Sequence, residues 1–221
     1  MGSDTSDARE LLRSIRAELA PAESDNRLVP LIESGAADRA VFAAIAAEET
    51  HIVRSDWRSC LQLATRAGEP TARAWFSGVA QGESLALGKL PALALAAGMT
   101  EQELDDYEPR AGCQAYPSYF AWLALNGEPC DVVIGVVANF SAWGDYCSRI
   151  AIAMRERYEF DAEACAFFDF FAVPVPDVED QAVAAVQAGI DTGRLDERRA
   201  RRYGRLFQSY ELMFWNTLAD T

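Results

Sequence analysis

Histidine is almost absent from this sequence of 221 residues, in which His51 is the only one. Metal sites that need several imidazoles, such as catalytic zinc sites and the paired E-x-x-H sites of helical-bundle diiron proteins, therefore have no support. Glu48-x-x-His51 has the E-x-x-H spacing once, but no second histidine can repeat it. We expect no metal and no cofactor, with a diiron site of one histidine and several carboxylates as the less favoured alternative.

Membrane-spanning and secretory patterns are also absent. The longest apolar run, Leu85 to Ala97, is too short to cross a bilayer and is interrupted by Lys89 and Pro91. The beginning of the sequence lacks the basic and apolar regions of a secretory signal peptide. The five cysteines include no C-x-x-C pair, and their odd number fits a reducing compartment. We therefore expect a cytoplasmic protein without a membrane partner.

Positive charge is scarce, with 20 lysines and arginines against 34 acidic residues and a net charge of −14. Nucleic acids and anionic membrane surfaces both attract proteins through a positive surface, so neither is an expected partner. The one basic cluster, between Arg194 and Arg205, is typical of a solvated helix face that pairs with neighbouring acids. A small molecule is the expected ligand, and a protein partner stays open.

No alternating strand pattern occurs, whereas helical spacing of apolar residues recurs along the chain. Thr100 followed by Glu103 predicts a capping box, and Pro117 is well placed as the first residue of a helix ending near Leu125. We expect an all-α bundle of roughly eight to ten helices. The predicted domain is single and spans residues 1–221, with residues 1–25 as an N-terminal helix and its lead-in.

The stretch from Val132 to Arg155 is apolar on almost every side, as expected for a helix buried on most of its surface. It carries Ser141, Asp145 and Ser148 at i, i+4 and i+7, which places them on one face. A buried carboxylate such as Asp145 requires a partner, water or a ligand. The stripe is therefore either a paired polar seam in the core or one wall of a polar cavity.

Two further carboxylates lie on apolar helix faces. Glu48 shares a face with aliphatic residues, and Glu211 follows Phe207 by four and precedes Phe214 by three. If Glu48, Asp145 and Glu211 converge, burial and mutual repulsion would raise their pKa values toward a range useful for proton transfer. The alternative is that each makes its own buried hydrogen bond or ion pair with an arginine.

Other catalytic patterns are missing. No G-x-S-x-G, Walker or G-x-G-x-x-G motif occurs, so hydrolase elbows and nucleotide-binding loops have no support. A nucleophilic cysteine needs an adjacent base and some exposure. Cys147 falls on the side of Phe140 and Trp143, away from the polar stripe, and is expected to be a packing residue.

The chain ends in FQSYELMFWNTL, which resembles the closing segment of the TenA/thiaminase II family, a family that includes PqqC-like proteins. The resemblance implies a heme-oxygenase-like helical fold and places Glu211 on the family's active-site glutamate. The stretch AYPSYF, residues 115–120, is similar to a second family segment, which implies that Tyr116 lines the pocket. The resemblance extends over most of the chain from about Val41 onward.

Two weaker matches add site residues. AEETHI, residues 47–52, is similar to a family stretch that implies Glu48 in place of the pyrimidine-binding aspartate and His51 in place of a pocket tyrosine. Ser141-Ala142-Trp143 falls where thiaminase II has its catalytic cysteine two residues before a tryptophan. A hydroxyl without an adjacent base is a poor nucleophile at neutral pH, so thiamine hydrolysis is not expected.

The sequence thus predicts a TenA-like enzyme that acts on a nitrogen-containing heterocycle or amine by metal-independent acid/base chemistry of the hydrolase or lyase type, in specialised biosynthesis. Glu211 and Glu48 are the predicted catalytic pair. The predicted substrate-binding residues are His51, Tyr116, Ser141, Asp145, Phe207 and Phe214. The alternative is a non-catalytic ligand-binding or regulatory partner protein, and a diiron oxidase is less favoured. The resemblance also implies a homo-oligomer, either a dimer or a tetramer.

Overall fold

The computed structural model describes residues 7–220, and these form helices joined by short loops, without a strand. The all-α prediction is confirmed. Eight helices have 11 or more residues, and α2, α5 and α6 are shorter. In chain order they are α1 (Ala8–Leu19), α2 (Leu28–Ser34), α3 (Ala40–Arg66), α4 (Pro70–Leu87), α5 (Leu90–Ala96), α6 (Glu101–Asp105), α7 (Ala111–Asn126), α8 (Pro129–Tyr158), α9 (Ala162–Ala172), α10 (Pro176–Asp191) and α11 (Glu197–Ala219).

The predicted lack of a leader rests partly on residues 1–6, which lie outside the described residues, and the single-domain interpretation stays a prediction. Within residues 7–220, no helix is both long enough and apolar enough to cross a membrane.

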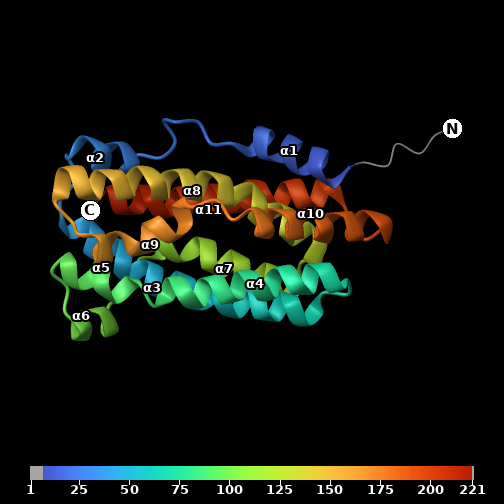
Figure 1. The fold of residues 1–221 in the computed structure, drawn as a ribbon, viewed down its shortest axis with the longest axis horizontal. Helices are drawn as coiled ribbons and strands as arrows, with labels where there is room; N and C mark the ends of the chain where they lie inside the picture. The colour runs from blue at the N-terminus through green and yellow to red at the C-terminus, as the bar shows by residue number, and fades with distance from the viewer. Residues whose placement is uncertain (1–6, 221) are drawn as a thin grey trace.

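The long helices run side by side along the long axis of the molecule (Figure 1). α3 packs against α4 and α7, while α11 packs against α7 and α8, so α7 joins the two pairs. α1 and α2 both lie against α8. Figure 1 shows α5 and α6 at the end of the bundle where the chain terminates. The middle of the bundle is therefore enclosed by α3, α4, α7, α8 and α11.

Two clusters of buried side chains form the core. One contains Phe42 of α3 and Trp215 of α11, and the other contains Trp75 of α4 and Phe207 of α11. The side chain of Tyr116 on α7 packs against both clusters. Removing this apolar surface from water is the main stabilising contribution. A cavity lined by Tyr116 therefore lies where the two clusters meet.

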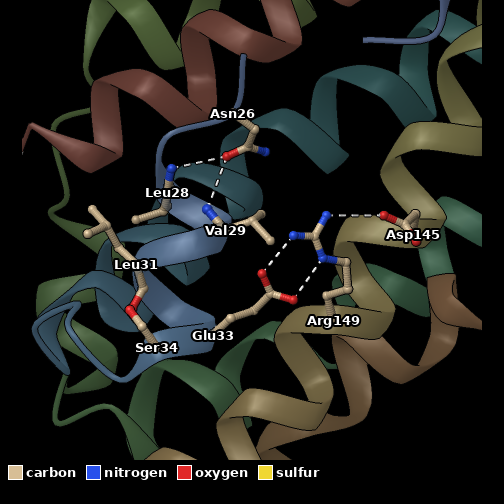
Figure 2. A network of polar contacts seen from close by, with 8 residues as sticks. All are labelled: Asn26, Leu28, Val29, Leu31, Glu33, Ser34, Asp145 and Arg149. Carbon is tan, nitrogen blue, oxygen red and sulfur yellow. Dashed lines mark hydrogen bonds and ion pairs between the residues drawn. The ribbon is translucent and has the colours of Figure 1, made fainter. Parts of the chain in front are cut away.

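α8 confirms only part of the prediction for the central stretch. Its first residues, 129–139, are all buried, but the polar stripe after them reaches the surface. The side chain of Asp145 is 63% exposed, and it lies 3.4 Å from the guanidinium of Arg149. Two further hydrogen bonds, of 2.8 and 2.6 Å, join that guanidinium to Glu33 of α2, as Figure 2 shows. The expected buried carboxylate at Asp145 is thus corrected to a surface ion pair.

The start of α7 also differs from the prediction. The capping box of Thr100 and Glu103 is present at α6, but Pro117 lies inside α7 instead of opening it. The main-chain N–H of Arg110, the N-cap residue of α7, donates to Glu48 of α3 over 2.9 Å. This distant carboxylate helps fix the beginning of the helix six residues before the proline. Local spacing could not reveal that contact.

Candidate functional site

A cavity of about 50 Å³ lies in the middle of the bundle. Four carboxyl groups line it: Glu49 and Asp56 from α3, Glu83 from α4 and Glu211 from α11. A cavity of this size holds a few water molecules or one small chemical group, because each water needs roughly 10–15 Å³ by this measure. The remaining lining residues are Ile52, Val53, Tyr116, Asn139, Phe140, Trp143, Phe171 and Phe214.

The four acids are withdrawn from water, since none of these residues is more than 8% exposed. Among the described residues, no lysine, arginine or histidine lines the cavity to compensate them. Burial raises the pKa of Glu83 to about 8, and it raises the pKa of Asp56 and Glu49 well above the ordinary range, with the charges of neighbouring acids adding to the effect. At neutral pH the cavity therefore holds carboxyl protons instead of four negative charges.

Glu211 is the most firmly held of the four. Nε1 of Trp215 donates a hydrogen bond of 3.0 Å to its Oε1, and Nδ2 of Asn139 donates to its Oε2. Burial raises the pKa of Glu211 to about 7, although these two donors oppose the rise. A carboxyl with this pKa is present in both protonation states near neutral pH. The group can therefore act as an acid or a base.

Asp56 contributes a polar atom that the chain leaves unsatisfied. Its Oδ1 is buried and makes no hydrogen bond within the described residues. Buried polar atoms in native proteins are nearly always paired with protein or with ordered water. Asp56 lies two helical turns after Glu49 on α3, and both face the same cavity. An atom of this kind marks a place where a water molecule or a polar group of a ligand fits.

Three of the predicted site residues lie at this cavity, namely Glu211, Tyr116 and Phe214. Tyr116 has a pKa raised well above its ordinary value, first by burial and then by the nearby acids, so its hydroxyl stays protonated. A protonated hydroxyl both donates and accepts hydrogen bonds. The side chain of Phe214 belongs to the apolar part of the wall.

Glu48 lies elsewhere, and the expectation that it faces Glu211 is corrected. Its fully buried carboxylate accepts hydrogen bonds from the Tyr107 hydroxyl at 2.8 Å, the Arg110 N–H at 2.9 Å and Gln114 at 3.2 Å. The Arg110 guanidinium lies 3.4 Å away. These contacts tie α3 to the start of α7. Glu49, the next residue, takes the position at the cavity.

His51 and Phe207 also lie outside the cavity. The imidazole of His51 lies 6.4 Å from the ring of Tyr107, between ring centroids. Phe207 is fully buried and packs against Tyr116 and Phe120, with ring centroids 5.3 Å away in both cases. It supports Tyr116 from behind instead of lining the cavity.

A second, outer cavity of about 600 Å³ adjoins the first. Four residues line both: Glu83, Phe140, Trp143 and Phe171. The polar stripe of α8, Ser141, Asp145 and Ser148, forms part of the outer wall, most of which is apolar. The polar stripe of α8 therefore lines a mostly apolar outer cavity and not the inner one, and Asn139 is the residue of α8 that contacts Glu211.

The residues that sequence reasoning missed are Glu49, Asp56, Glu83 and Asn139. The seven-residue spacing of Glu49 and Asp56 was a usable signal, because it places both on one helical face. Glu83 follows Val79 by four and precedes Ala86 by three, which is the same pattern that identified Glu211. Asn139 carries no such signal, since every residue from 129 to 139 is buried.

Metal binding finds no geometric support in residues 7–220. No three histidine, cysteine or acidic side chains there are arranged to hold a metal ion. All five cysteines are buried and free, and none lines either cavity. The described residues therefore offer neither a ligand set for a metal nor a thiolate nucleophile at the cavity.

The sequence of this chain matches a known protein family. The model of the TENA/THI-4/PQQC family matches residues 27–219. The chain belongs to this family. No match was found among curated proteins. The family assignment confirms the resemblance seen at the end of the chain.

Solved structures of TenA homologues share the fold. One from Pseudomonas syringae pv. tomato str. DC3000 has a TM-score of 0.77 at 12% sequence identity. The match covers 100% of this chain and 98% of the homologue's chain. Another, from P. horikoshii OT3, has a TM-score of 0.68 at 16% identity, over 97% of this chain and 95% of its own.

A third similar structure is described by the name of its fold. A domain of unknown function from Shewanella denitrificans OS217, described as having a heme oxygenase-like fold, has a TM-score of 0.63 at 13% identity over 94% of each chain. Identities this low establish the fold and no more. The TenA-family chain described here therefore has the heme-oxygenase-like fold.

Proposed function

We propose that this TenA-family protein is a small-molecule enzyme that acts on a nitrogen-containing heterocycle or amine by metal-independent acid/base chemistry. The observation that carries the proposal is Glu211, a carboxyl with a pKa of about 7 whose two oxygens are oriented by Trp215 and Asn139. A general acid or base works best with a pKa near the working pH. Glu49 replaces Glu48 as the second carboxyl of the pair.

The acids suit a basic nitrogen. A protonated amine or ring nitrogen donates hydrogen bonds to carboxylates, and the four lining acids provide such acceptors without a competing cation. In the proposed reaction Glu211 gives a proton to, or takes one from, the substrate nitrogen, while the Tyr116 hydroxyl positions it. The reaction class is hydrolase- or lyase-type, in which bond cleavage needs proton transfer and no electron carrier.

The α8 wall argues against thiaminase chemistry, although one structural relative, from Sulfolobus solfataricus, is described as a putative TenA-like thiaminase. Asn139 faces Glu211, and an amide is not a nucleophile. Ser141 lies on the outer cavity, and Cys147 is fully buried with a pKa raised well above its ordinary value. A buried neutral thiol is inert.

Turnover by purified protein is the direct test. Amines and nitrogen heterocycles are screened for conversion, and the active compound is then assayed with Glu211→Gln. We expect a loss of about 10²–10⁴-fold in kcat, the usual contribution of a general acid or base. Glu108→Gln, which changes an exposed acid on the loop before α7, is the matched control and should keep full activity. Unchanged activity in Glu211→Gln would eliminate the proposed role.

A non-catalytic ligand-binding protein is the second candidate, and it is favoured because no cysteine among the described residues lines either cavity. Thermal-shift measurements separate the two, because a ligand that binds the folded state raises Tm whether or not it is converted. Stabilisation by an amine without any turnover would support this candidate. The cytoplasmic location and the homo-oligomer stay predictions, and light scattering gives the mass of the assembly.

A further inference from the structure

Acidic side chains dominate the polar part of the inner cavity. It is lined by Glu49, Asp56, Glu83 and Glu211, and by no basic side chain from the part of the chain that the structure describes. An acidic cluster can exist for structural reasons, but Asp56 adds a second observation: the residue lines the cavity, and its buried Oδ1 makes no hydrogen bond within residues 7–220. A primary ammonium has three donors and no acceptor, and it matches such a set of oxygens.

Protonation lowers the free-energy cost of burying these four acids in the ligand-free protein. The groups that face the cavity are Glu49 and Asp56 from α3, Glu83 from α4, Tyr116 from α7 and Glu211 from α11, whereas α8 and α9 contribute Asn139 and aromatic side chains. The pKa values of about 7 for Glu211 and about 8 for Glu83 mean that an incoming cation displaces protons near neutral pH. Binding of a cation and release of protons are therefore linked.

The two cavities differ in size and in polarity. The inner one, about 50 Å³, admits a compact group only, while the outer one, about 600 Å³, has the size of a ligand pocket and a mostly apolar wall. Phe140, Trp143 and Phe171 line both cavities and therefore lie at their common boundary. Aromatic rings at such a boundary attract an ammonium group and also pack against a hydrocarbon chain.

We propose that the substrate is an amphiphilic amine whose ammonium group lies among the four acids of the inner cavity and whose hydrocarbon chain lies in the outer cavity. This assignment rests on the proposed function, because both use the same inner cavity. It narrows the expected substrate class from any compound with a basic nitrogen to amines that also have a long apolar part. Glu83 lines both cavities and marks the point where the charged and apolar parts of the ligand join.

Calorimetric binding of unbranched primary amines, from ethylamine to octylamine, tests the proposal. We expect the dissociation constant to fall by up to about fourfold for each added methylene until the chain fills the outer cavity, which is the effect of burying one methylene. Alcohols of the same chain lengths are the control for charge and should bind at least tenfold more weakly. Binding of the amines should also tighten between pH 6 and pH 8 and release protons, which titrations in two buffers of different ionisation enthalpy measure.

Two variants separate the head-group site from the chain site. Asp56→Asn removes a carboxylate without changing the size of the side chain, and it should weaken every amine at least tenfold. Gly78→Leu adds a side chain to the wall of the outer cavity, where a new Cβ meets only the amide oxygen of Gln181 at 3.8 Å. It should abolish the gain from longer chains while ethylamine binds as before. Ser84→Leu, on the exposed side of α4, is the matched control for added bulk.

The possible outcomes of these experiments distinguish a failure of this inference from a failure of the proposed function. Amines that bind without any dependence on chain length would overturn the inference and leave the proposed function intact, because Glu211→Gln tests that function separately. Alcohols that bind as tightly as amines would also overturn it. The alternative occupant of the outer cavity, which the exposed Val173 and Val175 help to line, is a second copy of the chain. In that case Gly78→Leu would lower the mass seen by light scattering and leave the amine series unchanged, which contradicts the inference.

Discussion

At the scale of single residues, Glu48 and Glu49 show how neighbours in sequence acquire different roles. Both are buried on α3, with exposed fractions of 0% and 3%. Glu48 is surrounded by donors from the segment that leads into α7. Glu49 instead faces other acids, and its pKa is raised well above the ordinary range by burial and then by Glu83 and Glu211. The first is a structural anchor and the second belongs to the cavity.

Glutamine at each position gives opposite results. Glu48→Gln places an amide N–H₂ among donors and breaks hydrogen bonds, so we expect the free energy of unfolding to fall by about 1–3 kcal/mol, with ligand binding kept. Glu49→Gln removes a proton-accepting group from a crowded acid cluster, so it should keep or raise stability and reduce turnover at least tenfold. Urea unfolding and the activity assay measure both effects. Equal stability of the two variants would contradict this assignment.

Sequence periodicity predicted the inward position of Glu211 and could not separate Glu48 from Glu49. On α11, exposed residues alternate with buried ones, and the spacing of Phe207, Glu211 and Phe214 identifies one face. On α3, all residues from Val41 to Thr50 are buried. A helix buried on every side gives no periodic signal, so only the packing of α4, α7 and α11 shows which side of it meets the cavity.

At the scale of helices, α8 and α11 pack closely at Gly135. A Cβ at this position would lie 3.3 Å from Cδ2 of Phe207 and 3.3 Å from Cβ of Tyr203, and 3.4 Å from the backbone nitrogen of Gly204. The backbone and rigid rings on the α11 side leave no room for a longer side chain. This contact allows α11 to lie close to α8, and at this short separation Asn139 of α8 donates a hydrogen bond to Glu211 of α11.

Gly135→Leu should therefore destabilise the protein. Overpacking of a well-packed core costs about 1–3 kcal/mol, and the shift of α11 should also weaken the contact of Glu211 with Asn139. We expect a lower Tm together with reduced activity or ligand binding. Gly78→Leu introduces the same side chain on α4 where there is space, and its Tm should change little. A Gly135→Leu protein as stable as Gly78→Leu would contradict the close packing.

The beginning of α7 shows a limit of local rules for helices. Capping patterns correctly predicted α6, where Thr100 and Glu103 bond to each other within one turn. Pro117 was expected to open a helix, but α7 begins at Ala111 and contains the proline in its second turn. The missing N–H of the proline costs one hydrogen bond to the carbonyl of Cys113. The anchoring of Arg110 by Glu48 favours the earlier start, and this contact joins residues 62 positions apart.

At the scale of the whole molecule, the fold class and the family were predictable from helical periodicity and the closing motif, whereas the two-cavity arrangement was not. The acids of the inner cavity lie on three helices, and their positions in the chain run from Glu49 to Glu211. Their common location depends on how α3, α4 and α11 pack, and no spacing within one helix encodes it. The polar stripe on α8 was visible in the sequence, but its exposure was not.

The buried acids also set how stability depends on pH. Glu83 and Glu211 have folded-state pKa values of about 8 and about 7, above the value of about 4.3 for an unfolded glutamate. The folded state therefore binds more protons than the unfolded state between these values. This contribution to stability is fully present below about pH 4.3 and is lost as pH rises through 7 and 8. The protein should be less stable at pH 8 than at pH 5.5, which is opposite to the effect of a salt-bridged acid.

Glu83→Gln tests this linkage because it keeps a neutral side chain of similar size at every pH. The free energy of unfolding should still fall as pH rises from about 5.5 to about 8, but less steeply. Removing one titrating group should reduce this slope by about 1.4 kcal/mol per pH unit. Urea unfolding across this range, with Glu108→Gln as the exposed control, measures the two slopes. Equal slopes in Glu83→Gln and the control would mean that Glu83 is already ionised in the folded protein, and the cavity would then carry negative charge before any ligand arrives.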